Sequence, residues 1–284
     1  MNHIRIVTDT ASDITRQEAK VKGIDLVALR IVFGDQDFIQ EEADNFRSFY
    51  ERLESDKEFP KTSRPTPSQY LSVYRDAEEK GQDVIVISVS SGLSGTYESA
   101  LVAKKMTDYQ DHIHVIDSQQ AILGQRLLVD YAVSLRQQGA ATESIVEKIE
   151  SLKERVKIFG VIDTLKYLKK GGRIPASLAF IGQTLQLKPI IELKQGQLGQ
   201  LDKKRGLKSA RKAMKAQLTK HSIDPAFPIL FGYTYQADNA KKFMEDMMEY
   251  YPQTQLDLYP VGGIIGSHVG PKAYAACFVE AADQ

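Results

Sequence analysis

Hydroxyl groups and glycines gather in one short segment, residues 90–96, which reads Ser-Ser-Gly-Leu-Ser-Gly-Thr. It follows an apolar run at 84–89 and precedes a helical pattern that begins at Tyr97. Glycines allow a ligand to approach the backbone, and hydroxyls and helix-start N–H groups donate to anions. The Lys-Ser/Thr ending of a nucleotide-binding phosphate loop is absent. The segment therefore predicts an anion site that need not hold a nucleotide, with a turn-and-cap role as the alternative.

Two further segments are rich in hydroxyls. Residues 61–67 read Lys-Thr-Ser-Arg-Pro-Thr-Pro, a loop that two prolines stiffen. Taken alone, this loop favours a helix cap with polar groups facing solvent over a binding site. Residues 8–13, Thr-Asp-Thr-Ala-Ser-Asp, could place two carboxylates on a metal ion. A turn that caps the next helix is the favoured interpretation of that segment.

Three cationic or titratable side chains also stand out. Arg173 follows two glycines, and His268 lies in the glycine-dense stretch 262–271, which predicts a loop. A lone histidine is usually structural, so a functional and a structural role are left open for His268. Arg205 stands between a predicted hairpin and a basic helix, where a solvated charge is favoured. The remaining histidines are scattered, and no metal-ligand set is expected from their spacing.

A serine hydrolase is the enzymatic alternative, with Ser94 as nucleophile and His268 as base. The Gly-x-Ser-x-Gly elbow of such enzymes is incomplete, because Gly92 has the required spacing from Ser94 but Gly95 falls one residue too early. This incomplete motif weakens the case for a hydrolase without excluding it.

The elements that would position these residues alternate between strands and helices in the first half of the chain, which predicts an α/β fold with a mostly parallel sheet. Ligands of such sheets bind at the carboxyl ends of the strands, where the loops 8–10, 88–91 and 117–118 would lie. The expected strands are 4–7, 26–32, 84–89 and 113–116, and the expected helices are 45–53, 68–79, 97–106 and 127–137.

The second half predicts a mixed arrangement of strands and helices, with a domain boundary near residue 160. A hairpin is expected around Gln195 and Gly196, between strands at 190–193 and 199–203. The other expected strands are 158–161, 229–233, 256–261 and 275–279, and the expected helices are 175–185, 207–220 and 239–250.

Composition excludes several classes of protein. Lys plus Arg equals Asp plus Glu at 37 each among 284 residues, and this balance argues against a nucleic-acid binder. The single cysteine, Cys277, has apolar neighbours and is expected to be a small buried residue. Asp9 and Asp13 interrupt the only early apolar stretch, and no run reaches the ~20 apolar residues of a membrane span. A soluble cytoplasmic protein is expected.

Taken together, these segments resemble the DegV family of bacterial fatty-acid-binding proteins, and the resemblance covers essentially the whole chain. Each motif is weak alone, but their order is specific. The motifs are Thr-Asp-Thr-Ala-Ser-Asp at 8–13, Thr-Ser-Arg-Pro-Thr at 62–66, Ser-Gly-Leu-Ser-Gly-Thr-Tyr at 91–97, Asp-Ser at 117–118, Gly-Gly-Arg-Ile at 171–174, Lys-Pro-Ile at 188–190 and Gly-Ser-His-Val-Gly-Pro at 266–271.

The resemblance implies two α/β domains, 1–160 and 161–284, that enclose a long-chain fatty acid. Members of the family carry the acyl chain for a separate, ATP-dependent fatty-acid kinase subunit, whose acyl phosphate product feeds phospholipid synthesis. By this similarity the chain is not an enzyme on its own and needs no cofactor or metal. Transient contact with a membrane surface for ligand exchange is a further expectation.

The resemblance also assigns roles to individual residues. Thr62, Ser63, Ser94 and Gly95 would hold the carboxylate. Arg173, Arg205 and His268 would lie near the mouth and assist phosphoryl transfer or kinase docking.

This sequence departs from the family pattern at two positions. Arg64 stands where Gln is frequent, and Lys272 stands where Gly is common. Both changes add positive charge and put kinase docking or ligand choice in question. A module for another hydrophobic ligand stays open beside the hydrolase, and the sequence leaves the acyl chain length, its unsaturation or branching, and the oligomeric state undetermined.

Overall fold

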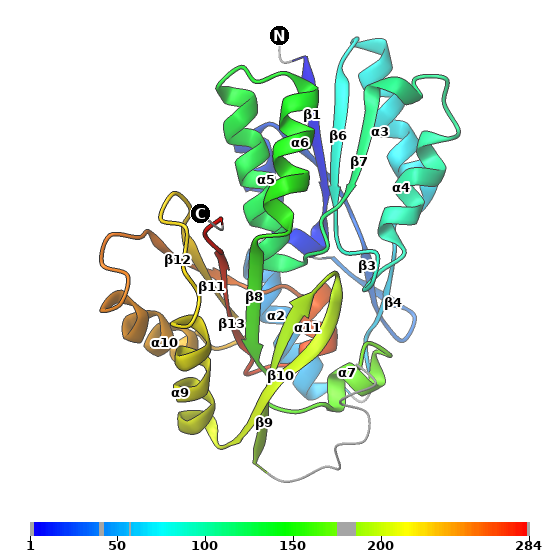
Figure 1. The fold of residues 1–284 in the computed structure, drawn as a ribbon. Helices are drawn as coiled ribbons and strands as arrows, with labels where there is room; N and C mark the ends of the chain where they lie inside the picture. Colours follow the sequence, from blue (N-terminus) through cyan, green and yellow to red (C-terminus); the bar gives the residue numbers. More distant parts are fainter. Residues whose placement is uncertain (1–2, 40–42, 57, 175–185, 283–284) are drawn as a thin grey trace.

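The chain forms two large β-sheets that follow one another along the long axis of the molecule (Figure 1). One is built from the first half of the chain and the other from the second half. The computed structural model describes residues 3–39, 43–56, 58–174 and 186–282. This arrangement confirms the α/β fold class and the parallel first sheet.

The first sheet has four parallel strands in the order β2-β1-β6-β7. Its strands are short and rich in Val and Ile, as buried parallel strands require. Helices α3 and α4 cover one face, and α5 and α6 cover the other (Figure 1). The elements are β1 Ile4–Asp9, β2 Ile24–Val27, β6 Asp83–Ser88, β7 Ile113–Asp117, α1 Arg16–Lys22, α3 Pro67–Glu79, α4 Thr96–Lys104, α5 Ile122–Gln137 and α6 Thr142–Lys153, with a 3₁₀ helix at Thr10–Ser12.

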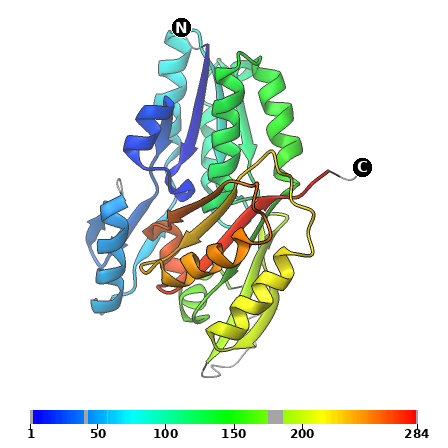
Figure 2. The same ribbon diagram turned by 90° about the vertical axis from the view of Figure 1, so that its left-hand side faces the viewer.

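The second sheet has six strands in the order β10-β9-β8-β13-β11-β12, of mixed direction. Helices α9 and α10 cover its outer face (Figure 2), and the inner face turns toward α5 and α11. The elements are β8 Val156–Val161, α7 Lys166–Lys170, β9 Leu187–Lys194, β10 Gln197–Arg205, α9 Leu207–Leu218, β11 Ile229–Tyr233, α10 Asp238–Met248, β12 Leu256–Pro260, α11 Gly263–Val269 and β13 Tyr274–Val279.

A small third sheet joins the two halves. Its antiparallel strands run β4-β3-β5, and both α2 and α11 pack against it and against each other. These elements are β3 Arg30–Phe33, β4 Gln36–Phe38, α2 Ala43–Ser55 and β5 Lys61–Ser63. Because β5 carries Thr62, this sheet sets the position of the second hydroxyl-rich segment.

The single strand expected at 26–32 is wrong, because this segment forms two strands in different sheets. β2 ends at Val27 and pairs with β1, while β3 begins at Arg30 and pairs with β4 and β5. Between them the Leu29 N–H donates to Thr10 Oγ1 at 3.0 Å, and this bond takes Leu29 out of any strand ladder. An apolar run alone does not show where a strand changes sheets.

The loop expected at 262–271 is also wrong, because Gly263–Val269 forms helix α11. Glycine lowers helix propensity, but here it permits close packing. A Cβ on Gly263 would overlap the Phe49 ring, and one on Gly266 would overlap the Tyr50 hydroxyl. The contact with α2 therefore requires glycines that, in the sequence, suggest a loop.

Two other expectations, the helix at 175–185 and the domain boundary near residue 160, are not tested by the described structure. The helix expected at 175–185 lies outside the described residues. The division near residue 160 stays a prediction, although β8, which starts at Val156, already belongs to the second sheet. Helix α6 was not predicted.

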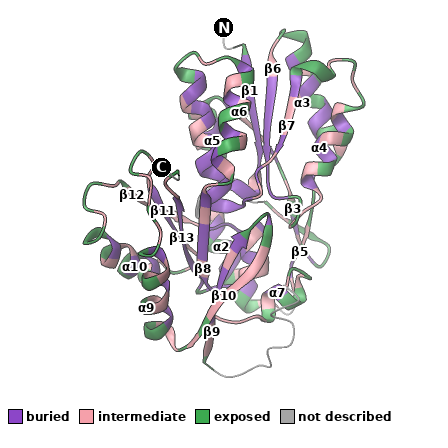
Figure 3. Ribbon diagram, viewed as in Figure 1, coloured by how far each residue is buried: buried purple, intermediate pink, exposed green. Residues whose placement is uncertain are grey.

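Buried residues lie on both faces of the two larger sheets and where the two halves meet (Figure 3). Cys277 lies fully buried in this core, as expected, and burial raises the pKa of its thiol. Within the described ranges, no helix combines the length and the apolar composition that a membrane crossing requires.

Candidate ligand-binding site

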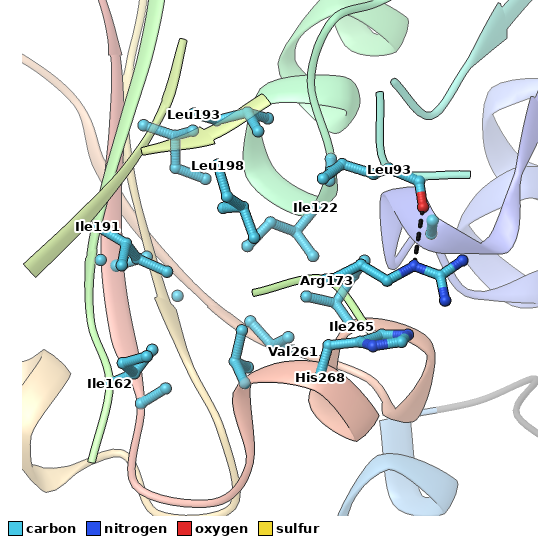
Figure 4. Close-up of a pocket in the computed structure, with 18 of the residues that line it drawn as sticks. Leu93, Ile122, Ile162, Arg173, Ile191, Leu193, Leu198, Val261, Ile265 and His268 are labelled. Atoms are coloured by element: carbon cyan, nitrogen blue, oxygen red, sulfur yellow. Dashed lines mark hydrogen bonds between the residues drawn. The ribbon is translucent and has the colours of Figure 1, made fainter. Parts of the chain in front are cut away.

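An apolar cavity lies between the two halves of the molecule (Figure 4). Its walls come from the inner face of the second sheet, the start of α5 and helix α11. Most of the lining is aliphatic and includes Ile122, Ile158, Ile191, Leu193, Leu198 and Val261. Such a cavity suits a hydrophobic ligand.

Strand alternation builds the wall formed by β9. Ile191 and Leu193 face the cavity, while Ile190 belongs to the core under α9 and α10. The other face of this strand carries Lys188, Glu192 and Lys194 beside Ile190. The sequence therefore shows which face is more apolar, but not that this face lines a cavity.

Ile122, at the start of α5, has a φ of 44°. This left-handed conformation is strained for a β-branched side chain. The preceding residues are fixed by hydrogen bonds: Ser118 Oγ donates to the Gln120 carbonyl at 3.1 Å, and Gln120 Nε2 donates to the Val156 carbonyl at 3.2 Å. The strained backbone places Ile122 in the cavity wall.

One end of the cavity is polar. Thr62, Ser94, Arg173 and His268 line it, and the Arg173 and His268 side chains lie opposite Ile162 and Ile191 (Figure 4). These four residues come from β5, the loop after β6, the segment after α7, and α11. The cavity therefore has an apolar interior and one end suited to a polar or anionic head group.

Thr62 contacts His268 directly, with 3.2 Å between Thr62 Oγ1 and His268 Nε2. Its neighbour Ser63 is exposed and does not line the cavity, because successive side chains of a strand point to opposite faces. The structure thus brings Thr62 to the polar end but not Ser63.

Ser94 is held by the turn that precedes α4. The Leu93 and Ser94 N–H groups donate to the Ser90 carbonyl at 3.0 and 3.1 Å, and Ser94 Oγ lies 2.8 Å from Thr96 Oγ1. Gly95 is the N-cap residue of α4. Ser94 thus lines the cavity one residue before the N-cap of α4.

Arg64 is exposed, and its Nη1 donates to the Gly95 carbonyl at 3.1 Å. This contact fixes the loop from outside the cavity. The other departure from the family pattern, Lys272, is exposed and has a φ of 68°, a conformation that glycine adopts more readily.

His268 stands near the C-terminal end of α11. Burial, reinforced by the positive charge of Arg173, lowers the pKa of its imidazole to about 4. The ring is therefore neutral at pH 7. Its Nδ1 is buried and has no hydrogen-bond partner among the described residues.

Arg173 is exposed, and its Nε donates to the Leu93 carbonyl at 3.2 Å, which joins the segment after α7 to the Ser94 loop (Figure 4). Its Nη1 donates to the Gly171 carbonyl at 2.9 Å. Arg205, at the end of β10, is also exposed but is not among the residues that line the cavity. The structure brings together Thr62, Ser94, Arg173 and His268, and leaves Arg205 outside this group.

The arrangement does not form a hydrolase triad in the part of the chain that the structure describes. Ser94 Oγ bonds Thr96 rather than His268, and no carboxylate orients His268 Nδ1. A nucleophilic serine needs both contacts.

The acidic segment at 8–13 forms a turn rather than a metal site. Asp9 Oδ1 accepts from the Ala11 N–H at 3.0 Å, and Asp9 Oδ2 accepts from the Val89 N–H at 2.8 Å. Burial raises the pKa of Asp9 to about 6, although these bonds oppose the rise. Across the described ranges, no three His, Cys, Asp or Glu side chains are placed to hold a metal ion.

Comparison with known proteins agrees with this architecture. The family model described as "Uncharacterised protein, DegV family" matches residues 3–281. Protein DegV of Bacillus subtilis is 29% identical, over 97% of this chain and 99% of its own length.

Solved structures show the same fold. The fatty-acid-binding DegV family protein of Thermus thermophilus is 28% identical, with a TM-score of 0.87 over 98% of this chain and 100% of its own. A stearic-acid-binding protein of Eubacterium ventriosum is 28% identical, with a TM-score of 0.81 over 97% of each chain. The chain therefore belongs to the DegV family.

Proposed function

We propose that this protein binds one long-chain fatty acid, with the acyl chain in the apolar cavity and the carboxylate at Thr62 and Ser94. The observation that carries the proposal is the combination of an aliphatic cavity with hydroxyl groups at one end. The fatty acids bound by relatives of similar fold support it.

The energetics fit a carrier. Burying a 16-carbon chain contributes roughly 10 kcal/mol before costs, at about 0.8 kcal/mol per methylene. A hydrogen bond to a charged carboxylate adds only ~1.5–3 kcal/mol, also before desolvation. The acyl chain therefore supplies most of the affinity, and the hydroxyls determine which end of the ligand faces the mouth.

The head-group site is tested by removing its hydroxyls. We expect Thr62→Ala and Ser94→Ala each to raise the dissociation constant for palmitate about tenfold, and the double variant to raise it further. Isothermal titration with delipidated protein measures this change.

Ser63→Ala is the matched control, since it removes a hydroxyl from the same strand on the exposed face. It should bind palmitate like the wild type. Equal loss in Ser63→Ala and Thr62→Ala, or full affinity in the double variant, would contradict this placement of the carboxylate.

In the same proposal, the bound carboxylate is presented to a separate ATP-dependent fatty-acid kinase, whose acyl phosphate enters phospholipid synthesis in the cytoplasm. Two features support this role. The exposed guanidinium of Arg173 lies beside the polar end, where it can stabilise charge on a transferring phosphoryl group. The family resemblance assigns Arg205 and His268 to phosphoryl transfer or kinase docking.

The kinase role is tested by separating retention of lipid from turnover. Arg173→Ala, Arg205→Ala and His268→Ala should each keep co-purified lipid and lose acyl-phosphate formation with a purified kinase subunit. Arg75→Ala, an exposed change on α3, is the control and should keep both. Full turnover in the first three variants would overturn this part of the proposal.

A further inference from the structure

The tip of the β9–β10 hairpin lies against the loop that carries Ser94. The hairpin turns at Gln195 and Gly196, and its strands contribute Ile191, Leu193 and Leu198 to the cavity wall. The loop contributes Leu93 and Ser94. This contact therefore joins the wall around the proposed acyl chain to the proposed head-group site.

Ser90 makes the contact from the loop side. Its side chain is fully buried, and its Oγ donates to the Gly196 carbonyl at 2.7 Å while accepting from the Gly92 N–H at 3.2 Å. Its carbonyl accepts from the Leu93 and Ser94 N–H groups, and its own N–H donates to the Gln120 carbonyl at 2.8 Å. Every hydrogen-bonding group of Ser90 thus holds either the Ser94 turn or a segment packed against it.

Gly92 allows the hairpin tip to approach this closely. A Cβ on Gly92 would overlap the Gly196 carbonyl oxygen, the same atom that accepts from Ser90. Gly92 is exposed and its φ is not in the left-handed region, so a side chain there would disturb this contact without straining its own backbone.

We propose that Ser90 is a positioning residue of the lipid site and that its bond to Gly196 is a latch holding the β9–β10 hairpin against the Ser94 loop. The inference rests on the proposed fatty-acid binding. The latch holds the Ser94 hydroxyl at the edge of the cavity. It also keeps the cavity wall closed around the acyl chain.

Loss of the latch leaves the Gly196 carbonyl buried without a partner, which favours separation of the hairpin tip from the loop. Because the hairpin strands and the loop both line the cavity, separation of the tip from the loop opens a path for the acyl chain. The ligand should then leave faster, and the Ser94 loop should become less protected from hydrogen exchange.

The probe is cis-parinaric acid, an 18-carbon fatty acid that fluoresces in apolar surroundings. We expect Ser90→Ala to release it about tenfold faster than the wild type when excess oleate is added. Hydrogen exchange should increase in residues 89–97 and 194–200 and not elsewhere. Ser91→Ala is the matched control, because Ser91 is exposed and its hydroxyl donates to Asp117 rather than to the hairpin.

Gly92→Ala disturbs the same latch without changing Ser90, and so tests the proposal if Ser90→Ala fails to fold. It should also release the probe faster. Gly199→Ala is its control on the same hairpin, because a Cβ there meets the Glu192 side chain at 3.6 Å, an ordinary contact.

The outcomes separate the latch from the proposed function. Release at the wild-type rate from Ser90→Ala and Gly92→Ala would overturn the latch and leave fatty-acid binding standing. Faster exchange spread over the whole chain would show that Ser90 serves general stability, and would also overturn it. A wild type that takes up no cis-parinaric acid would overturn the proposed function, and the latch with it.

Discussion

At the polar end of the cavity, three of the four lining side chains, those of Thr62, Ser94 and His268, are neutral at pH 7. Thr62 and Ser94 offer hydroxyls, and burial keeps the His268 imidazole uncharged. A buried lysine would bind a carboxylate more tightly but would weaken it as a nucleophile. In the proposed role, neutral donors would orient the carboxylate and leave it reactive, and Arg173 at the surface would supply positive charge where a phosphoryl group arrives.

The buried imidazole predicts a defined pH dependence. The pKa of His268 is about 4 in the folded protein and about 6.5 when unfolded. Between these values the unfolded chain binds more protons, so this residue lowers the free energy of unfolding as pH falls from about 6.5 to 4, by on the order of 1 kcal/mol per pH unit. NMR titration should show a His268 resonance that titrates near pH 4.

The contribution of His268 must be separated from that of two buried carboxyls. Burial raises the pKa of Asp9 to about 6 and of Asp13 to about 8, and their effect on stability has the opposite sign in this pH range. Urea unfolding of the wild type and of His268→Gln therefore has to be compared at each pH. A difference between the two that does not change from pH 6.5 to 4.5 would contradict a buried neutral His268.

Among the helices and strands, α11 positions the site residue His268 through its packing against α2. It lies against α2, and its last turn carries His268 to Thr62. The Tyr50 hydroxyl donates to the Val261 carbonyl at 2.8 Å, just before α11, and occupies the space where a side chain on residue 266 would lie.

Gly266→Ala should therefore destabilise the protein by about 1–3 kcal/mol, because the new methyl group overlaps the Tyr50 hydroxyl. The double variant with Tyr50→Phe removes that oxygen and should recover part of the loss. Urea unfolding of the four proteins in this cycle gives the coupling between the two sites. Strictly additive effects would show that α11 does not depend on this contact.

Strands and helices with a clear period were predictable. The hairpin around Gln195 and Gly196 and the helix opened by Thr66 and Pro67 follow from local residue types alone. Helix α11 was not predictable, because its glycines are explained by side chains more than 200 residues away, those of Ile31, Phe49 and Tyr50. The division of 26–32 between two sheets likewise depends on a bond from Leu29 to distant Thr10.

The same distinction applies to the site. Hydroxyls near glycines pointed to Ser94, and the order of motifs pointed to Thr62 and His268, which the structure places side by side. Which of Thr62 and Ser63 faces the cavity depends on how β5 pairs with β3. Leu198, near the start of β10, lines the cavity, whereas Arg205, at the end of this strand, does not. The sequence does not show in which direction a strand runs relative to a cavity.

For the whole molecule, the cavity lies where the two halves meet, so a bound acyl chain would form part of the core between them. A ligand that binds only the folded state raises the free energy of unfolding in proportion to the logarithm of its concentration above Kd. Removal of lipid should therefore lower the melting temperature, and added palmitate should restore it in a scanning fluorescence experiment. An unchanged melting temperature would count against a ligand in the core.

Native mass spectrometry of the purified protein, followed by denaturing extraction, tests the central claim most directly. We predict one molecule of a long-chain fatty acid per chain, released on denaturation and identifiable by its mass. Its length and unsaturation would then define the shape of the ligand that the cavity accepts. A protein that is empty as purified and takes up no added fatty acid would contradict the account, as would a stoichiometric ligand of another chemical class.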